Sequence, residues 1–251
     1  MPERSRVTAV MAIGVYNVVQ NLLVPAPAYV PANLVATAGL VAMARAQGCT
    51  WDDLGLDPSR AGTGLWLGMT GAGLATVVAL AARAHPATRR YLLDQRVADQ
   101  RNSDVAYRVV VRFPLGTALF EEVAFRGVVS AVWQRSGASK SQAAVAAATT
   151  FGLWHIIPGN DALTGNPLAS RFGSLRARVA VVIVGTIATG LAGLGFTWMR
   201  ERSGSLAAPW MTHAAINGAV YLAGVAHWRR VARDSPAGVG MVGAKSGAHD
   251  E

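Results

Sequence analysis

Residues 113–133 read FPLGTALFEEVAFRGVVSAVW, and three ionisable side chains stand in the middle of this apolar stretch. They are Glu121, Glu122 and Arg126. An ionisable side chain at the centre of a bilayer costs about 2.5–3.5 kcal/mol on insertion scales. Two adjacent glutamates at such a depth therefore need polar partners, and those partners must lie on other apolar segments of the chain.

Long uncharged segments occur throughout this 251-residue chain, of which 52% is hydrophobic and only 15% is charged. A soluble domain carries about 25% charged residues, and a membrane-spanning helix needs about 20 predominantly apolar residues. A soluble, alanine-rich helical bundle is the alternative, but uncharged runs of this length would leave its helices without a polar face. The segments without Asp, Glu, Lys or Arg are 7–44, 61–82, 141–160, 179–199 and 203–228.

The pattern predicts an all-α, polytopic protein of the cell membrane, a bundle of about seven transmembrane helices with a polar site inside it. We expect a single domain over 1–228, with a catalytic core at 105–228, followed by a disordered basic tail at 229–251. The first span resembles a cleavable signal peptide, but Asn and Gln residues interrupt its apolar core and a second apolar run follows at once. The expected spans are 7–24, 29–46, 63–82, 105–134, 141–158, 177–199 and 206–228.

Several local signals refine this picture. Gly64 and Gly68 form a GxxxG pair, which favours close helix packing within the bundle over a homodimer seam. Pro114 is expected to bend its helix near the start, and the turn-forming residues of 159–176 predict a loop. Trp and Leu residues in the connector 47–62 indicate a location at the membrane interface.

The net charge of +9 raises the alternative of nucleic-acid binding. The arginines stand in short loops between apolar runs, where anionic lipid headgroups attract them. We therefore expect membrane lipid as a partner and no nucleic acid. The distribution of arginines favours an external N-terminus and a cytoplasmic tail, and the single Cys49 excludes an intrachain disulfide.

The two glutamates are expected to have different surroundings. Residues four apart share a helix face, so Glu122 and Arg126 can pair. Glu121 points about 100° away from that face and lacks this partner. A carboxylate without a partner in an apolar site suits a general base.

Two other predicted spans contribute His155, and His213 with Asn217. In one chemistry Glu121 and His155 activate a water that attacks a carbonyl group, while His213 and Asn217 donate to the oxyanion. In another, His155, His213 and Glu121 hold Zn²⁺ with one position open for water. The asparagine favours the metal-free version. Because the sequence leaves both chemistries open, we expect either no cofactor or Zn²⁺.

These residues form three motifs in order: EExxxR at 121–126, FxxxH at 151–155 and HxxxN at 213–217. Their order and separation resemble the CPBP family of intramembrane endopeptidases, which comprises CAAX proteases and bacteriocin-processing enzymes and is also called the Abi family. Each motif alone is weak, whereas three in order on separate spans are specific. The strong part of the resemblance covers about 105–217.

The resemblance implies an intramembrane endopeptidase acting on a membrane-associated protein or peptide, either lipidated or carrying a leader sequence. Eukaryotic members cut prenylated proteins and release a C-terminal tripeptide. The family is often labelled as metalloproteases, although a glutamate-dependent mechanism has been argued for it. The implied catalytic set is Glu121 as base, Glu122 and Arg126 as its support, His155 as the water-activating partner, and His213 with Asn217 as the oxyanion site.

Two other function classes compete with the protease. A non-catalytic membrane adaptor or bacteriocin-immunity protein would keep the polar cluster for structural reasons alone. A transporter would use Glu121 as a proton or ion relay. The sequence shows no inverted repeat, and its first half lacks the buried ionisable groups of its second half, which disfavours the transporter.

Overall fold

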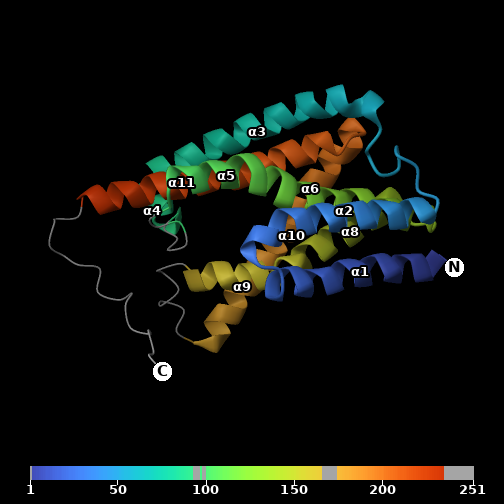
Figure 1. Cartoon of the computed structure of the whole chain (residues 1–251), viewed down its shortest axis with the longest axis horizontal. Coiled ribbons are helices and arrows are strands. Elements are labelled where there is room, and N and C mark those ends of the chain that lie inside the picture. The colour runs from blue at the N-terminus through green and yellow to red at the C-terminus, as the bar shows by residue number, and fades with distance from the viewer. Residues whose placement is uncertain (1, 93–96, 98–99, 166–173, 235–251) are drawn as a thin grey trace.

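The computed structural model describes residues 2–92, 97, 100–165 and 174–234, and all regular secondary structure in these ranges is helical. Seven long helical segments pack side by side, with α3 and α1 at opposite edges (Figure 1). Six of them are α1 (Pro2–Leu22), α2 (Tyr29–Ala46), α3 (Ala61–Ala84), α8 (Lys140–Trp154), α10 (Leu175–Ser203) and α11 (Ala207–Asp234). The seventh is continuous and comprises α5 (Asn102–Tyr107), η5 (Arg108–Ala118), α6 (Leu119–Glu122), η6 (Val123–Val129) and α7 (Ser130–Arg135).

Shorter helices join these segments. They are η1 (Ala26–Ala28), η2 (Pro58–Arg60), α4 (Pro86–Arg89), η3 (Arg90–Leu92) and α9 (Ile156–Gly165). The helical content of the described residues confirms the all-α fold class.

The continuous segment from α5 to α7 is the centre of the bundle and carries both glutamates. Every residue of η6 is buried. Its two π-helical stretches, η5 and η6, depart from α geometry, and Pro114, where a bend was expected, lies within η5. A proline removes one backbone donor from the helix, and π-helical turns recur at functional sites.

Small residues set the packing of α3 along α11 (Figure 1). A methyl group on Gly64 would lie 3.0 Å from Cβ of Ala207, and one on Gly68 would lie 3.0 Å from Cβ of Met211. The two helices therefore approach too closely for larger side chains. The GxxxG pair packs within the bundle, as predicted.

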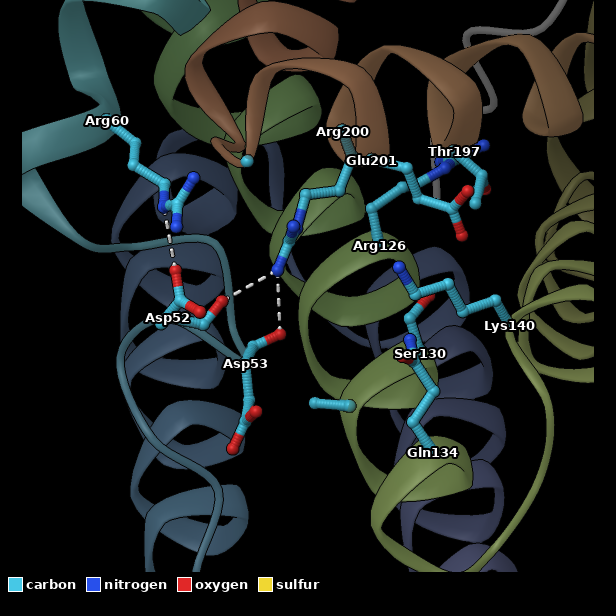
Figure 2. Close-up of a pocket in the computed structure, with 12 residues that line it drawn as sticks. Asp52, Asp53, Arg60, Arg126, Ser130, Gln134, Lys140, Thr197, Arg200 and Glu201 are labelled. Atoms are coloured by element: carbon cyan, nitrogen blue, oxygen red, sulfur yellow. Dashed lines mark hydrogen bonds and ion pairs between the residues drawn. The ribbon is translucent and has the colours of Figure 1, made fainter.

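The connector between α2 and α3 is held against the end of α10. Nη2 of Arg200 donates to the backbone carbonyl oxygens of Asp52 at 2.8 Å and Asp53 at 2.9 Å (Figure 2). Leu54, between them and η2, is fully buried in the core. The side chain of Leu54 therefore packs against the core of the protein and not against lipid, whereas Trp51 is half exposed. The interfacial location of this connector stays a prediction.

Arg200→Ala is expected to lower the free energy of unfolding by about 1–3 kcal/mol, because a hydrogen bond from a charged donor contributes about 1.5–3 kcal/mol and this one is partly screened by solvent. The measurement is the thermal unfolding midpoint in detergent. Arg202→Ala, an exposed arginine on the same helix, is the matched control. Equal midpoints for the two variants would mean that Arg200 does not hold the connector.

Three predicted boundaries are wrong. The expected loop 159–176 is helical up to residue 165 in α9, and the expected span 141–158 is interrupted at His155, where α8 ends. Residues 229–234 of the expected disordered tail continue α11. Residues 166–173 and 235–251 lie outside the described residues.

Three helical segments are long and apolar enough to cross a membrane: Ala26–Ala46, Pro58–Ala84 and Leu175–Ser203. This finding supports a membrane protein. The larger number of about seven spans stays a prediction.

Candidate active site

The two glutamates lie inside the bundle, where side chains from α8 and α11 meet α6. Glu121 is 5% exposed, and Glu122 and Arg126 are fully buried. Nη1 of Arg126 lies 3.2 Å from Oε1 of Glu122, which confirms the predicted pair. Removing two charges from water is costly unless they are paired and hydrogen-bonded, so this pair needs further partners.

His213, on α11, supplies one of them. Its Nδ1 lies 2.7 Å from Oε1 of Glu122, and because a carboxylate only accepts, the imidazole donates. The ring stacks on Phe196 with centroids 5.1 Å apart and planes 14° from parallel. Nε2, the other nitrogen, therefore points toward Glu121 and lies 3.6 Å from its Oε2.

His155 caps the C-terminal end of α8 and lies on the other side of Glu121. Its Nδ1 lies 2.8 Å from the carbonyl oxygen of Phe151, so Nδ1 carries the proton and donates it. In the neutral imidazole Nε2 is then an acceptor, and it lies 3.8 Å from Oε2 of Glu121. The side chain is 26% exposed, which keeps this acceptor accessible.

Trp154 orients Glu121, a contact that the sequence reasoning missed. The indole Nε1 donates to Oε1 of Glu121 at 3.1 Å. Oε2 of the same carboxylate has no hydrogen-bond partner among the described residues. An indole is a donor only and usually finds a partner when buried, so a tryptophan adjoining His155 was the available signal.

A cavity of about 1000 Å³ opens beside these groups. Glu121, His155, His213 and Asn217 all line it, and Asn217 lies one helical turn after His213 on α11. Its other walls are mostly apolar and include residues of α9, α10 and α11 and residues between α3 and α5. The structure thus brings all four of these predicted residues to one cavity, with Glu122 and Arg126 directly behind Glu121.

Comparison with known families gives one match. Residues 104–219 match the family described as Type II CAAX prenyl endopeptidase Rce1-like. Over these residues the chain is similar to the Rce1-like family. The matched segment contains all three motifs and confirms the predicted resemblance to the CPBP family, and it supports a protease acting in the membrane. Searches of curated proteins and of solved structures gave no match.

The Zn²⁺ alternative requires three ligands of the Rce1-like region to converge on one point. Within the described residues, no group of three or more His, Cys, Asp or Glu side chains is arranged to hold a metal ion. Nδ1 of each histidine is bonded, to Phe151 and to Glu122, so Nε2 is the ring atom left for a metal. Because no such group converges among the described residues, the proposed steps use the side chains alone.

Arg126 of the Rce1-like region also lines a second cavity, of about 270 Å³, together with Ser130 and Thr197 (Figure 2). Its guanidinium carbon lies 4.0 Å from the ring centroid of Phe151 and 5.1 Å from that of Phe196. A cation over an aromatic face is attracted by the ring quadrupole. Aromatic contacts and one carboxylate therefore fix the guanidinium, while its Nε and Nη2 have no hydrogen-bond partner among the described residues.

Gly193→Ala, on α10, is expected to lower any peptide cleavage at this candidate site about tenfold or more, because a 1 Å misplacement of a supporting group is enough for large losses. A methyl group there would lie 2.8 Å from Nη2 of Arg126 and 3.1 Å from the ring of Phe151. Gly195→Ala, two residues on, places its methyl group in open space and is the matched control. The measurement is the initial cleavage rate of each variant. Equal rates would mean that the methyl group at position 193 does not disturb the site through Arg126 or Phe151.

Proposed function

We propose that this chain is an intramembrane endopeptidase that hydrolyses a peptide bond of a membrane-associated substrate. The observation that carries the proposal is the pair of acceptors at the cavity wall, Oε2 of Glu121 and Nε2 of His155, 3.8 Å apart. That separation is too long for a direct hydrogen bond, but one water placed about 2.8 Å from both atoms would donate one hydrogen bond to each. The water is thereby oriented and made more nucleophilic.

The proposed reaction begins when this water attacks the substrate carbonyl carbon and its proton passes to Glu121. The carbonyl electrons move to oxygen, which becomes an oxyanion. When the tetrahedral intermediate collapses, the carbon–nitrogen bond breaks and Glu121 returns the proton to the leaving amine. The products are a carboxylate terminus and an amine terminus, so one water is consumed for each bond cut.

His213 and Asn217 are proposed to donate to the oxyanion, which is worth about 2.7–4 kcal/mol for one such donor. Because Nδ1 of His213 donates to Glu122 at 2.7 Å, Nε2 can donate only from the doubly protonated ring. When the ring of His213 is charged, it and Arg126 balance the two glutamate carboxylates. Glu122 and Arg126 are therefore support groups that hold His213 and neutralise the buried site.

The substrate is proposed to be a lipidated, CAAX-type peptide. A leader peptide is the alternative substrate. An apolar cavity of about 1000 Å³ has room for an apolar anchor beside the cleaved segment. We propose that all seven long helical segments cross the membrane, because this places Glu121 at a depth where a lipid-anchored peptide arrives. The cavity reaches Leu92 and Val97, between α3 and α5, on the side of the membrane that the arginine distribution predicts to be cytoplasmic.

The test is cleavage of peptides by the purified wild-type protein in detergent, with products identified by mass spectrometry. A farnesylated CAAX-type peptide, its unprenylated form and a leader-type peptide are incubated with and without a zinc chelator. Cleavage at one bond of the farnesylated peptide that survives chelation is expected. Absence of cleavage of every peptide by folded protein would contradict the proposal, and loss on chelation with recovery on adding Zn²⁺ would contradict its metal-free form.

A further inference from the structure

We propose that Arg112 forms a carboxylate-binding subsite in the large cavity and holds the free C-terminal carboxylate of the substrate. This inference rests on the proposed function, since it concerns how that substrate is recognised. It makes Arg112 a specificity-determining residue, separate from the groups that act on the cleaved bond.

The charge of the cavity wall is the first support. Among the described residues that line the cavity, Arg112 is the one Arg or Lys side chain. No carboxylate among the described residues forms an ion pair with it. Arg112 is half-buried, and a guanidinium matches the planar, two-oxygen geometry of a carboxylate.

A tyrosine holds this guanidinium in place. The guanidinium carbon of Arg112 lies 4.1 Å from the ring centroid of Tyr29. The Tyr29 hydroxyl lies 3.2 Å from Oγ1 of Thr117, and Gly116 lets the ring approach, because a methyl group there would lie 3.1 Å from it. Stacking occupies one face of the guanidinium and leaves its N–H edge available for a ligand.

The π-helical backbone explains how Arg112 and Glu121 come to line the same cavity. In a straight α-helix nine residues turn a side chain by about 900°, which leaves it about 180° away on the opposite face. Both residues nevertheless line one cavity, and η5 covers Arg108–Ala118 between them. The wider π-helical turns change the rotation per residue, and this change brings both side chains to the same cavity.

The separation fits a short peptide end. Nine helical residues rise by about 13 Å, and an extended peptide advances about 3.3–3.6 Å per residue. A substrate whose cleaved bond lies at Glu121 would therefore place a carboxylate at Arg112 about three to four residues further on. The same cation could instead bind the phosphate of a lipid headgroup, which offers similar oxyanion chemistry, so the experiment must separate the two.

The experiment compares two farnesylated peptides that differ only in ending as a carboxylate or as a carboxamide. The wild-type protein is expected to prefer the carboxylate in kcat/KM by about tenfold to a hundredfold, as for a charged hydrogen bond. In Arg112→Gln this preference is expected to fall to within about twofold of unity, chiefly through KM, and Arg112→Lys should recover part of it. Arg108→Gln removes the same charge one turn earlier, outside the cavity lining, and is expected to keep the wild-type preference.

Binding separates this proposal from the proposed function. Fluorescent forms of both peptides are titrated onto Glu121→Gln and onto Glu121→Gln with Arg112→Gln, so that no turnover is needed. Tighter binding of the carboxylate, lost in the double variant, supports the subsite even if no peptide is cleaved. Equal binding of both peptides overturns the proposal. If, in addition, phosphatidylglycerol competes with the peptides and this competition depends on Arg112, the cation binds lipid instead.

Discussion

Replacing Glu121 by glutamine is expected to lower the rate of peptide cleavage by about 10³-fold or more while the protein stays folded. The amide has the same shape, and its oxygen can still accept the hydrogen bond that Trp154 donates to Oε1 at 3.1 Å. It cannot take a proton from water. Because general base catalysis alone contributes about 10²–10⁴-fold, nearly all turnover should be lost.

The measurement is the initial rate for the farnesylated peptide at equal concentrations of monodisperse protein. Glu201→Gln is the matched control, since Glu201 is an exposed carboxylate on α10 and lines only the second cavity. A Glu121→Gln variant that keeps more than about a tenth of the wild-type rate would remove Glu121 from the role of base. A variant that loses its folded state instead would point to a structural role.

The Glu122–Arg126 pair was predictable because it depends only on the period of one helix. Any two residues four apart on a helix are neighbours, so no knowledge of the other helices was needed. The bond from His213 to Glu122 joins residues 91 apart in sequence. Its geometry depends on the rotation of α11 against the central segment, which hydropathy does not fix, and the sequence therefore suggested an oxyanion role for His213 without its contact to Glu122.

The end of α8 shows why boundaries were harder to predict. The apolar run continues through Ile156 and Ile157, so hydropathy gave no signal at His155. Pro158 was interpreted as the end of a helix, but proline is tolerated in the first helical turn, where backbone N–H groups have no partner within the helix. It stands in the first turn of α9. The break matters, because it exposes His155 at the end of α8.

The set of residues that line the cavity could not be predicted from the sequence. Thr117 and Glu121 share a helix face by period alone, whereas Arg112 joins them through the π-helical turns of η5. No regular period indicates such a stretch. The candidate base was therefore predictable, and the proposed specificity residue was not.

Arg126→Met is expected to lower the free energy of unfolding by about 3–5 kcal/mol, the second large effect. Arg126 is fully buried, and its loss leaves Glu122 as a buried carboxylate with His213 as its remaining partner. Removing one partner of a buried pair is costly because the other charge loses its compensation. Unfolding in a titration of sodium dodecyl sulfate, followed by tryptophan fluorescence, gives the size of the effect.

The double variant Glu122→Gln with Arg126→Met separates charge compensation from shape. If the cost of the single change comes from the isolated carboxylate, the double variant should recover most of the lost stability, because replacing both members of a buried pair is often nearly neutral. Its cleavage rate should stay low, since an amide at position 122 can still accept from Nδ1 of His213 but supplies no negative charge to balance the charged ring that the proposed oxyanion contact requires. A double variant as unstable as the single one would instead mean that Arg126 stabilises the fold through Phe151 and Phe196, whose rings lie 4.0 and 5.1 Å from its guanidinium carbon.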